Sequence, residues 1–130
     1  MDTVRKSRIL AKQYQLYNCI ALYRYTVKEL RGIYNGCGPE FFPAWIRRLL
    51  DSCTAAERPA ILIHDVEFAQ GGSVWDFVKA NFRLFVNCWI CAGKYYSPGS
   101  PLRWHHRRLA LILAAACMVG GWRAWNSEDL

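Results

Sequence analysis

The sequence predicts an all-α protein, and three observations lead to that fold class. Residues 4–31 contain neither proline nor glycine, and their apolar residues recur at helical spacing. A Ser-x-x-Asp pattern at 73–76 and a Ser-Pro pair at 100–101 mark the starts of later helices. No stretch alternates apolar and polar residues as a half-buried strand does. We therefore expect about five helices in one domain over residues 1–130, a length that supports a single hydrophobic core.

The first expected helix covers about residues 4–31 and is basic and rich in tyrosine. Its apolar side chains can share one broad face, made of Ile9, Leu16, Ile20, Tyr23, Val27 and Leu30. Gly32 is expected to end this helix, because glycine tolerates the left-handed conformation of a helix stop. A loop with three glycines and one proline follows over residues 32–42.

Four shorter helices are expected after this loop, and each has a recognisable boundary signal. Proline suits the first turn of a helix, so Pro43 starts the second one, which reaches about residue 53. The third runs from about residue 55 or 59 to residue 69 and ends at Gly71–Gly72. The fourth is capped by Ser73 and reaches about residue 92, and the fifth runs from about 100 to 119.

The composition is that of a folded, basic protein. Hydrophobic residues make up 53% of the chain and aromatic residues 15%, which is too apolar for disorder. The formal net charge is +7, and basic residues dominate the first expected helix. Such a surface favours an anionic partner: phospholipid headgroups, nucleic acid or an acidic protein. Charge alone does not choose among them.

The most apolar segment covers residues 109–121 and is too short to span a bilayer, which takes about 18–20 residues. A buried core helix is the first interpretation, and insertion into one leaflet is the second. Residues 1–17 lack the apolar core of a signal peptide. We therefore expect a protein that is cytoplasmic as synthesised, or carried in a virion.

Six cysteines are present, and only Cys88 and Cys91 are closely spaced. A single C-x-x-C could be half of a zinc site. It lies in an apolar stretch, however, and this favours two buried thiols.

The pair His64-Asp65 lies in the third expected helix, between Ile63 and Val66. Adjacent side chains on a helix diverge by about 100°, so the two can act on neighbouring points of one pocket. A histidine accepts a proton from water near neutral pH, and a carboxylate beside backbone carbonyls suits calcium. Burying both groups is unfavourable unless they are paired or bind an ion. The alternative is an exposed Asp and a His satisfied by a backbone carbonyl.

Three elements of the sequence together resemble the phospholipase A2 superfamily. They are Asn-Gly-Cys-Gly-Pro at 35–39, His-Asp-x-x-Phe at 64–68, and Gly71–Gly72. The resemblance covers about residues 32–90 and is closest to short forms from bacteria and tailed phages. It implies a phospholipase A2-like helical bundle in which an antiparallel helix pair carries the His-Asp motif, with the helix at 4–31 as an extension. It also implies a calcium-dependent ester hydrolase that acts on phospholipid at membrane surfaces.

The resemblance implies a role for five residues of this chain. Asp65 would be the carboxylate ligand of calcium, and His64 would be the general base that activates water. Gly36, Gly38 and Glu40 would offer backbone carbonyls to the ion. The amide of Gly38, together with calcium, would stabilise the oxyanion of the tetrahedral intermediate.

The sequence departs from the family pattern at three positions. The best candidate to hold His64 is Asn81, where the family has an Asp, and Phe68 replaces a tyrosine that would brace that carboxylate. Asp76 is an alternative partner, but its spacing from Ser73 favours a helix cap. Ile61 replaces a cysteine, so the loop disulfide of the family is not expected. An Asn can orient an imidazole but does not stabilise its charged form as a carboxylate does, so we expect calcium binding with slow or lost turnover.

Two tryptophan-containing clusters near the C-terminus remain open to two interpretations each. The segment Trp-His-His-Arg-Arg at 104–108 suits a membrane or phosphate surface, or is a solvated helix start. Trp122 and Trp125 flank Arg123 and suit a membrane interface or the closing of a core.

Two classes of function follow. The first is a calcium-dependent phospholipid hydrolase. The second is a non-catalytic phage or virion structural or assembly protein on the same scaffold, whose helix at 4–31 packs on partner subunits, on further copies of the chain or on nucleic acid. A small nucleic-acid binder is a third interpretation that rests on charge alone.

Overall fold

The computed structural model describes residues 2–34, 44–45, 48, 56–122 and 125. This part of the chain is all-α, with no strand. The elements are α1 (Thr3–Gln13), the 3-10 helix η1 (Cys19–Arg24), α2 (Val27–Ile33), α4 (Arg58–Gln70), α5 (Val74–Tyr95) and α6 (Pro101–Gly120). The predicted all-α class is therefore confirmed for this part of the chain.

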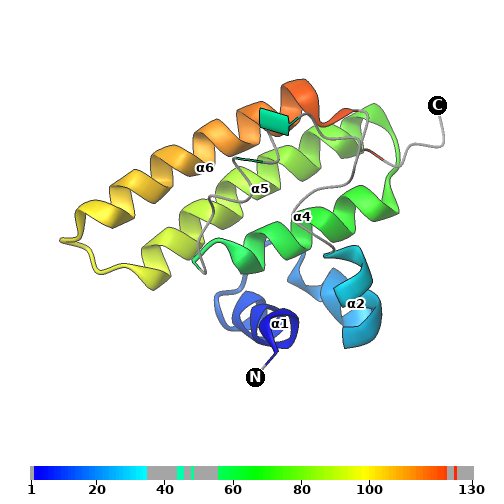
Figure 1. The fold of residues 1–130 in the computed structure, drawn as a ribbon, viewed down its shortest axis with the longest axis horizontal. Helices are drawn as coiled ribbons and strands as arrows, with labels where there is room; N and C mark the ends of the chain where they lie inside the picture. The colour runs from blue at the N-terminus through cyan, green and yellow to red at the C-terminus, as the bar shows by residue number, and fades with distance from the viewer. Residues whose placement is uncertain (1, 35–43, 46–47, 49–55, 123–124, 126–130) are drawn as a thin grey trace.

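Helices α4, α5 and α6 lie side by side, with α5 in contact with both neighbours, while α1 and α2 pack on α4 from the side away from α6 (Figure 1). Helix α4 is therefore covered on all faces, and every residue from Pro59 to Phe68 is buried. The largest fully buried apolar side chains come from all these layers: Leu22, Leu30, Ile61, Leu62, Ile63, Val66, Leu84 and Leu113. Because α4 carries His64 and Asp65, both lie at the centre of the molecule.

The prediction of a single helix over residues 4–31 is wrong. The chain leaves α1 after Gln13 and turns through Gln15 (φ 54°) and Asn18 (φ 64°), both in the left-handed region that interrupts a helix. It then forms η1, and α2 begins at Val27 with Thr26 as its N-cap. Thr26 and Glu29 form a capping box. This Thr-x-x-Glu pattern marks a helix start inside a segment whose periodicity predicted one continuous helix.

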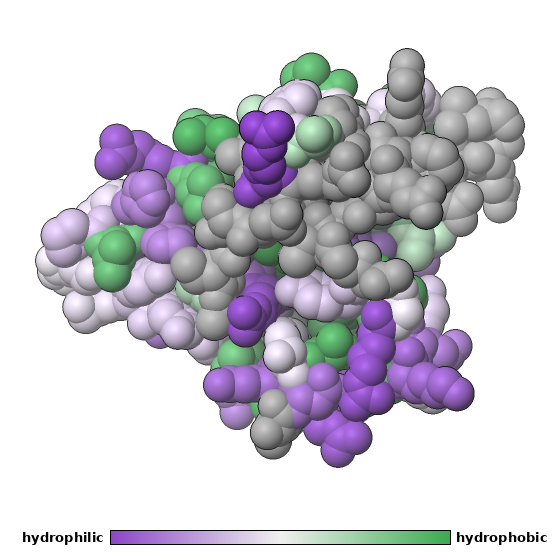
Figure 2. Space-filling view, viewed as in Figure 1, coloured by the Kyte–Doolittle hydropathy of each residue, from purple (hydrophilic) through white to green (hydrophobic). Residues whose placement is uncertain are grey.

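This break changes which N-terminal side chains are buried. Leu16 and Leu30 enter the core as expected, whereas Ile20 is 67% exposed and Tyr23 is 45% exposed. Gly32 does not end the helix, because α2 continues to Ile33 and its C-cap is Tyr34. Hydrophilic side chains gather over α1 and α2 on the face shown in Figure 2.

Of the second expected helix, 43–53, the structure describes Ala44, Trp45 and Arg48, all helical. The rest of that segment, and the glycine loop at 35–42, lie outside the described residues.

The turn between α4 and α5 has the predicted form. Gly71 (φ 68°) and Gly72 (φ 132°) adopt conformations that other residues rarely accept. Ser73 Oγ then accepts a hydrogen bond from the Asp76 amide at 3.2 Å, and Asp76 Oδ2 accepts one from the Ser73 amide at 3.0 Å. The predicted capping box is confirmed, and α5 runs three residues past its expected end.

Helix α6 is buried on one side only. Leu113 and Cys117 face the core, whereas Leu111, Ile112 and Val119 are exposed, so the apolar segment 109–121 is only partly a core helix. No helix in the described part of the chain combines the length and apolar content needed to cross a bilayer.

Two further predictions concern the interior. Cys88 and Cys91 are buried free thiols, as the apolar context indicated. Trp125 closes the core: it is 3% exposed and packs edge-on against Phe68 and Phe77, with ring centroids 5.0 and 5.6 Å away. Trp122 packs edge-on against Phe77 at 5.1 Å.

Candidate active site

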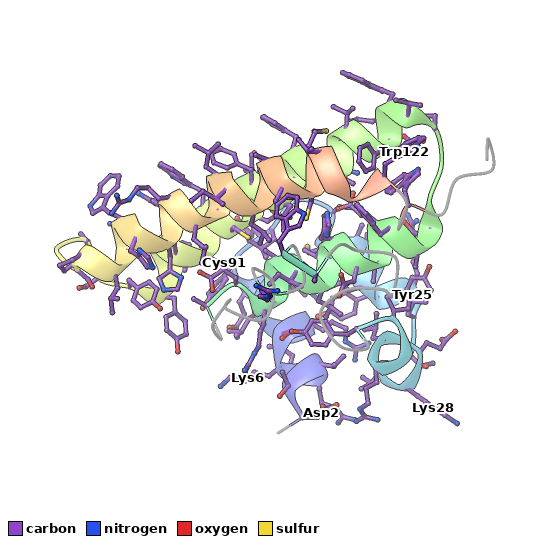
Figure 3. All side chains as sticks on the ribbon, turned by 45° about the horizontal axis from the view of Figure 1, so that its top comes forward. Asp2, Lys6, Tyr25, Lys28, Cys91 and Trp122 are labelled. Atoms are coloured by element: carbon purple, nitrogen blue, oxygen red, sulfur yellow. The ribbon has the colours of Figure 1, made fainter. Side chains whose placement is uncertain are left out.

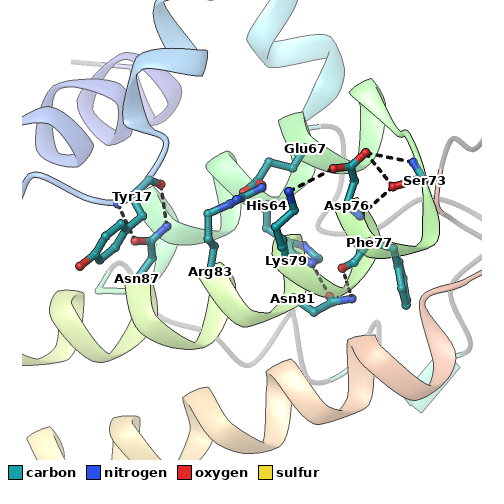
Figure 4. A network of polar contacts seen from close by, with 10 residues as sticks. All are labelled: Tyr17, His64, Glu67, Ser73, Asp76, Phe77, Lys79, Asn81, Arg83 and Asn87. Atoms are coloured by element: carbon teal, nitrogen blue, oxygen red, sulfur yellow. Dashed lines mark hydrogen bonds and ion pairs between the residues drawn. The ribbon is translucent and has the colours of Figure 1, made fainter.

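The antiparallel pair of α4 and α5 brings together polar side chains that are 16 and 17 residues apart in the sequence (Figure 4). The two-glycine turn and the capping box at Ser73 reverse the chain within three residues. His64 and Glu67 of α4 consequently face Asn81 and Arg83 of α5.

His64 is held by Asn81, the residue favoured for this position from the sequence. The distance from His64 Nε2 to Asn81 Oδ1 is 2.9 Å. Asn81 Nδ2 donates to the carbonyl of Phe77 at 3.1 Å, which assigns Oδ1 as the acceptor. The imidazole must therefore carry its proton on Nε2, and in the neutral ring the lone pair lies on Nδ1.

Burial decides the charge of this imidazole. His64 is 2% exposed, and desolvation lowers its pKa to about 4, although the hydrogen bond to Asn81 acts in the opposite direction. The Phe68 ring lies against the imidazole, with centroids 4.3 Å apart. At neutral pH His64 is uncharged and has a proton-accepting nitrogen, but it is a weak base.

Asp65 points to a different side of α4. It is 9% exposed, and burial raises its pKa to about 8. Its charge helps to raise the pKa of the Cys117 thiol, which identifies α6 as its neighbour. Within the described ranges no group donates a hydrogen bond to this carboxylate. A cation beside it would offset the unfavourable desolvation of the ionised form.

The chemistry of Asp65 suits a hard cation such as calcium, which binds oxygen ligands. The other expected ligands, Gly36, Gly38 and Glu40, lie outside the described residues. Among the residues that are described, no three His, Cys, Asp or Glu side chains are grouped so as to hold a metal ion. Of the four expected ligands, Asp65 is the one that lies among the described residues.

Asp76, the alternative partner of His64, is engaged in capping α5. Its hydrogen bonds to Ser73 lower its pKa, and its other oxygen lies 3.5 Å from Lys79 Nζ. It is exposed at the start of the helix, whereas His64 is buried in the middle of α4. Asp76 therefore caps α5 and is not the partner of the His64 imidazole.

An ion pair between Glu67 and Arg83 lies beside the His64–Asn81 contact and was not anticipated from the sequence. Arg83 donates to Glu67 Oε2 through Nε at 2.6 Å and also through Nη2. Glu67 is 4% exposed, and burial raises its pKa while Arg83 acts to lower it. The only sequence signal was the spacing of Glu67 three residues after His64, which puts both on neighbouring faces of α4.

Asn87 provides a second unanticipated contact, one that fixes the N-terminal segment. Its Oδ1 accepts from the Tyr17 amide at 2.8 Å, and its Nδ2 donates to the Tyr17 carbonyl at 3.1 Å. Asn87 is fully buried, so one side chain satisfies the backbone of the turn between α1 and η1.

The adjacent histidines at 105 and 106 have separate environments. His105 is exposed, but His106 is 5% exposed and pairs through Nδ1 with Glu57, which is itself buried. The Tyr96 hydroxyl lies 3.1 Å from His106 Nε2. His106 therefore belongs to the core and to neither a solvated helix start nor a surface patch.

Comparison with protein-family models, with curated proteins and with solved structures finds no match for this chain.

Proposed function

We propose that this protein is a phospholipase A2-like, calcium-dependent phospholipid ester hydrolase with slow turnover. The observation that carries the proposal is the 2.9 Å hydrogen bond between His64 Nε2 and Asn81 Oδ1 across an antiparallel helix pair. It orients the imidazole with its lone pair on Nδ1, one residue before a buried carboxylate that lacks a described hydrogen-bond donor. The glycine loop at 35–39 and the His-Asp-x-x-Phe motif supply the family resemblance.

In the proposed reaction, His64 Nδ1 takes a proton from water while the water oxygen attacks the ester carbonyl carbon. The ester C–O bond then breaks, and the imidazolium returns the proton to the leaving alkoxide. Calcium bound at Asp65 would supply the positive charge that stabilises the oxyanion. Asn81 holds the required tautomer throughout.

Two properties of the site favour slow turnover. Asn81 is uncharged, so it stabilises the imidazolium that forms during the reaction less than a carboxylate would. Burial, which lowers the pKa of His64 to about 4, opposes that charge further. A general base works best with a pKa near the operating pH, so His64 is poorly matched to neutral conditions.

The test is the release of fatty acid from a short-chain phospholipid that is soluble as a monomer, with calcium or with a chelator. A monomeric substrate makes the assay independent of membrane binding. We expect calcium-dependent release that is lost in His64→Gln and retained in His105→Gln, which changes an exposed histidine in the same way. Calorimetric titration should give calcium binding that is weakened in Asp65→Asn. Fatty-acid release that is unchanged by the chelator and by His64→Gln would contradict the hydrolase proposal.

A second candidate is a non-catalytic virion or assembly protein, and the observation in its favour is the exposed apolar surface of the N-terminal segment. Tyr17, Ile20 and Tyr23 are 58%, 67% and 45% exposed in a segment that also carries much of the positive charge. Subunit contacts through residues 3–33 would cover them. Light scattering of the wild type and Ile20→Asp distinguishes the candidates: a stable oligomer that the substitution dissociates, without calcium-dependent release, favours assembly.

A further inference from the structure

Two arginines converge on one glycine where α5 and α6 meet. Arg103 and Arg107 lie one turn apart on α6, and Arg103 Nη2 donates to the Gly93 carbonyl of α5 at 3.0 Å. A Cβ at Gly93 would lie 2.8 Å from Arg107 Nη2 and 3.2 Å from Arg103 Nη2. The absence of a side chain at Gly93 therefore allows both guanidinium groups to approach the same point.

Two tryptophans frame these cations. The Arg107 guanidinium carbon lies 4.4 Å from the Trp89 ring centroid and 5.3 Å from that of Trp104. The two indoles meet edge-on at 6.4 Å, and they are 38% and 55% exposed. We call Trp89, Arg103, Trp104 and Arg107 the arginine–tryptophan patch.

The positive charge of the patch is not neutralised within the described part of the chain. The ion pairs among the described residues are formed by Arg31, Lys79, Arg83 and His106. Neither Arg103 nor Arg107 takes part in one. The Nε atoms of Arg103 and Arg107 are buried without a hydrogen-bond partner there. The positive charge of Arg103 also acts on Arg107, whose pKa is lowered first by burial and then by that repulsion. Like charges held together in this way are stabilised by an anion.

The patch continues into an exposed apolar stripe on α6. Trp104, Arg108, Leu111 and Val119 are all exposed and follow the helical repeat, and Ile112 lies beside them. Large side chains project from the outer side of the α5–α6 pair, away from α1 and α2 (Figure 3). A helix face with arginines and tryptophan at one end and aliphatic side chains along it has the composition of a surface that lies in a membrane interface.

We propose that the arginine–tryptophan patch and the adjoining stripe on α6 dock on an anionic phospholipid bilayer, with Arg103 and Arg107 binding headgroup phosphate. A nucleic acid would fit less well, because the Arg107 guanidinium already covers one face of each indole on which a base would stack. The exposed aliphatic stripe also has no counterpart on a nucleic acid. The proposal is independent of ester hydrolysis, because none of these residues belongs to the α4–α5 site.

The first test is co-flotation of the full chain with vesicles of phosphatidylcholine alone or mixed with phosphatidylglycerol. We expect binding to the mixed vesicles only. Arg107→Glu should weaken it by roughly 10-fold or more, since each cation at an anionic surface contributes strongly. Lys28→Glu makes the same charge change at an exposed position on α2 and should alter binding by less than about 2-fold. Equal loss in both variants, or no binding of the wild type, overturns the proposal.

The second test uses the indoles, and neither substitution disturbs the core. Trp104→Ala should weaken binding to the mixed vesicles by roughly 5-fold, because a half-exposed indole loses its contact with the bilayer. Trp75→Ala, at a 66% exposed position at the start of α5, should leave binding unchanged. A single-stranded oligonucleotide provides the competing outcome. If it binds more tightly than the vesicles and Arg107→Glu abolishes that binding, the surface is a nucleic-acid site and the lipid proposal is wrong.

Discussion

Asn81 accepts a hydrogen bond from His64 Nε2 at 2.9 Å and donates one to the carbonyl of Phe77 at 3.1 Å. One amide therefore fixes both its own orientation and the tautomer of the imidazole. The contact joins α4 to α5 in the interior, where Asn81 is fully buried. An uncharged partner suits this position, because a carboxylate would face the Phe77 carbonyl without a donor of its own.

Asn81→Asp is expected to raise the pKa of His64 from its value of about 4, because a carboxylate stabilises the imidazolium. If the protein is a hydrolase, turnover should rise by on the order of 10²-fold, a part of the roughly 10⁴-fold effect of the orienting carboxylate in serine proteases. NMR titration of the imidazole measures the pKa, and fatty-acid release measures the turnover.

Gln70→Glu is the matched control, because it adds one carboxylate to the exposed end of the same helix. It should leave the titration of His64 unchanged. A His64 pKa that stays near 4 in Asn81→Asp would contradict the assignment of Asn81 as its partner.

Stability should depend on pH through His64. The pKa is about 4 in the folded protein and about 6.5 when unfolded, so the unfolded state binds the proton first as pH falls. This contribution is present above pH 6.5 and is lost between about pH 6.5 and 4, with a limit on the order of 3 kcal/mol. Asp65, with a raised pKa, acts in the opposite sense between about pH 8 and 4. The difference in unfolding free energy between wild type and His64→Gln isolates the histidine.

The difference in unfolding free energy between wild type and His64→Gln should be large at pH 7 and shrink toward pH 4, as measured by urea denaturation at each pH. A difference that is constant with pH would mean that His64 has the same pKa in the folded and the unfolded protein, as an exposed histidine does.

The helices that could be predicted from the sequence are those with local signals. Gly71–Gly72, the Ser73–Asp76 box and Ser100–Pro101 act within a few residues, and α4, α5 and α6 begin or end at them. The break after α1 depends on distant contacts. The left-handed Gln15 and Asn18 flank Tyr17, whose backbone is held by Asn87, 70 residues away. Periodicity over residues 4–31 carries no trace of that contact.

The buried polar contacts could also be predicted only in part from the sequence. The contact between His64 and Asn81 could be predicted because the family resemblance supplied a template for two helices. The burial of Glu67 and Glu57 could not be predicted, since a glutamate in a sequence is typical of the surface. Their burial follows from the central position of α4, which is covered by α1, α2 and α5.

The Glu67–Arg83 ion pair should contribute strongly to stability when only one partner is removed. Arg83→Ala would leave a buried carboxylate unpaired and is expected to lower the free energy of unfolding by about 3–5 kcal/mol. Lys79→Ala, which removes the exposed partner of Asp76, should change it by less than about 1 kcal/mol. Replacing both Glu67 and Arg83 with Met should recover much of the loss. Urea denaturation measures all four proteins, and equal effects of the two single substitutions would contradict a buried pair.

Asn87→Ala should loosen the N-terminal segment. It removes both hydrogen bonds to the Tyr17 backbone, and the expected loss is about 2–4 kcal/mol. Tyr17→Phe keeps these backbone contacts and alters an exposed side chain, so stability should change by less than about 0.5 kcal/mol. Amide hydrogen exchange should speed up over residues 14–25 in Asn87→Ala. Unchanged exchange there would show that the segment is held by other contacts.

Gly72→Ala and Gly32→Ala should change stability in opposite directions. At Gly72 the φ angle is 132°, and a Cβ would lie 2.5 Å from Asp76 Oδ2, the oxygen that caps α5. The substitution should cost about 2–4 kcal/mol, from backbone strain and from the displaced cap. At Gly32, inside α2, the added methyl group would meet no described atom within 4 Å apart from its chain neighbours and the backbone of its own helix, so alanine should stabilise by about 0.5–1 kcal/mol. Thermal unfolding measures both. Adding Asp76→Ala to Gly72→Ala separates the backbone strain from the displaced cap, because the clash with Asp76 disappears. The double variant should therefore lose less stability than the sum of the two single losses. Strict additivity would mean that strain alone is responsible.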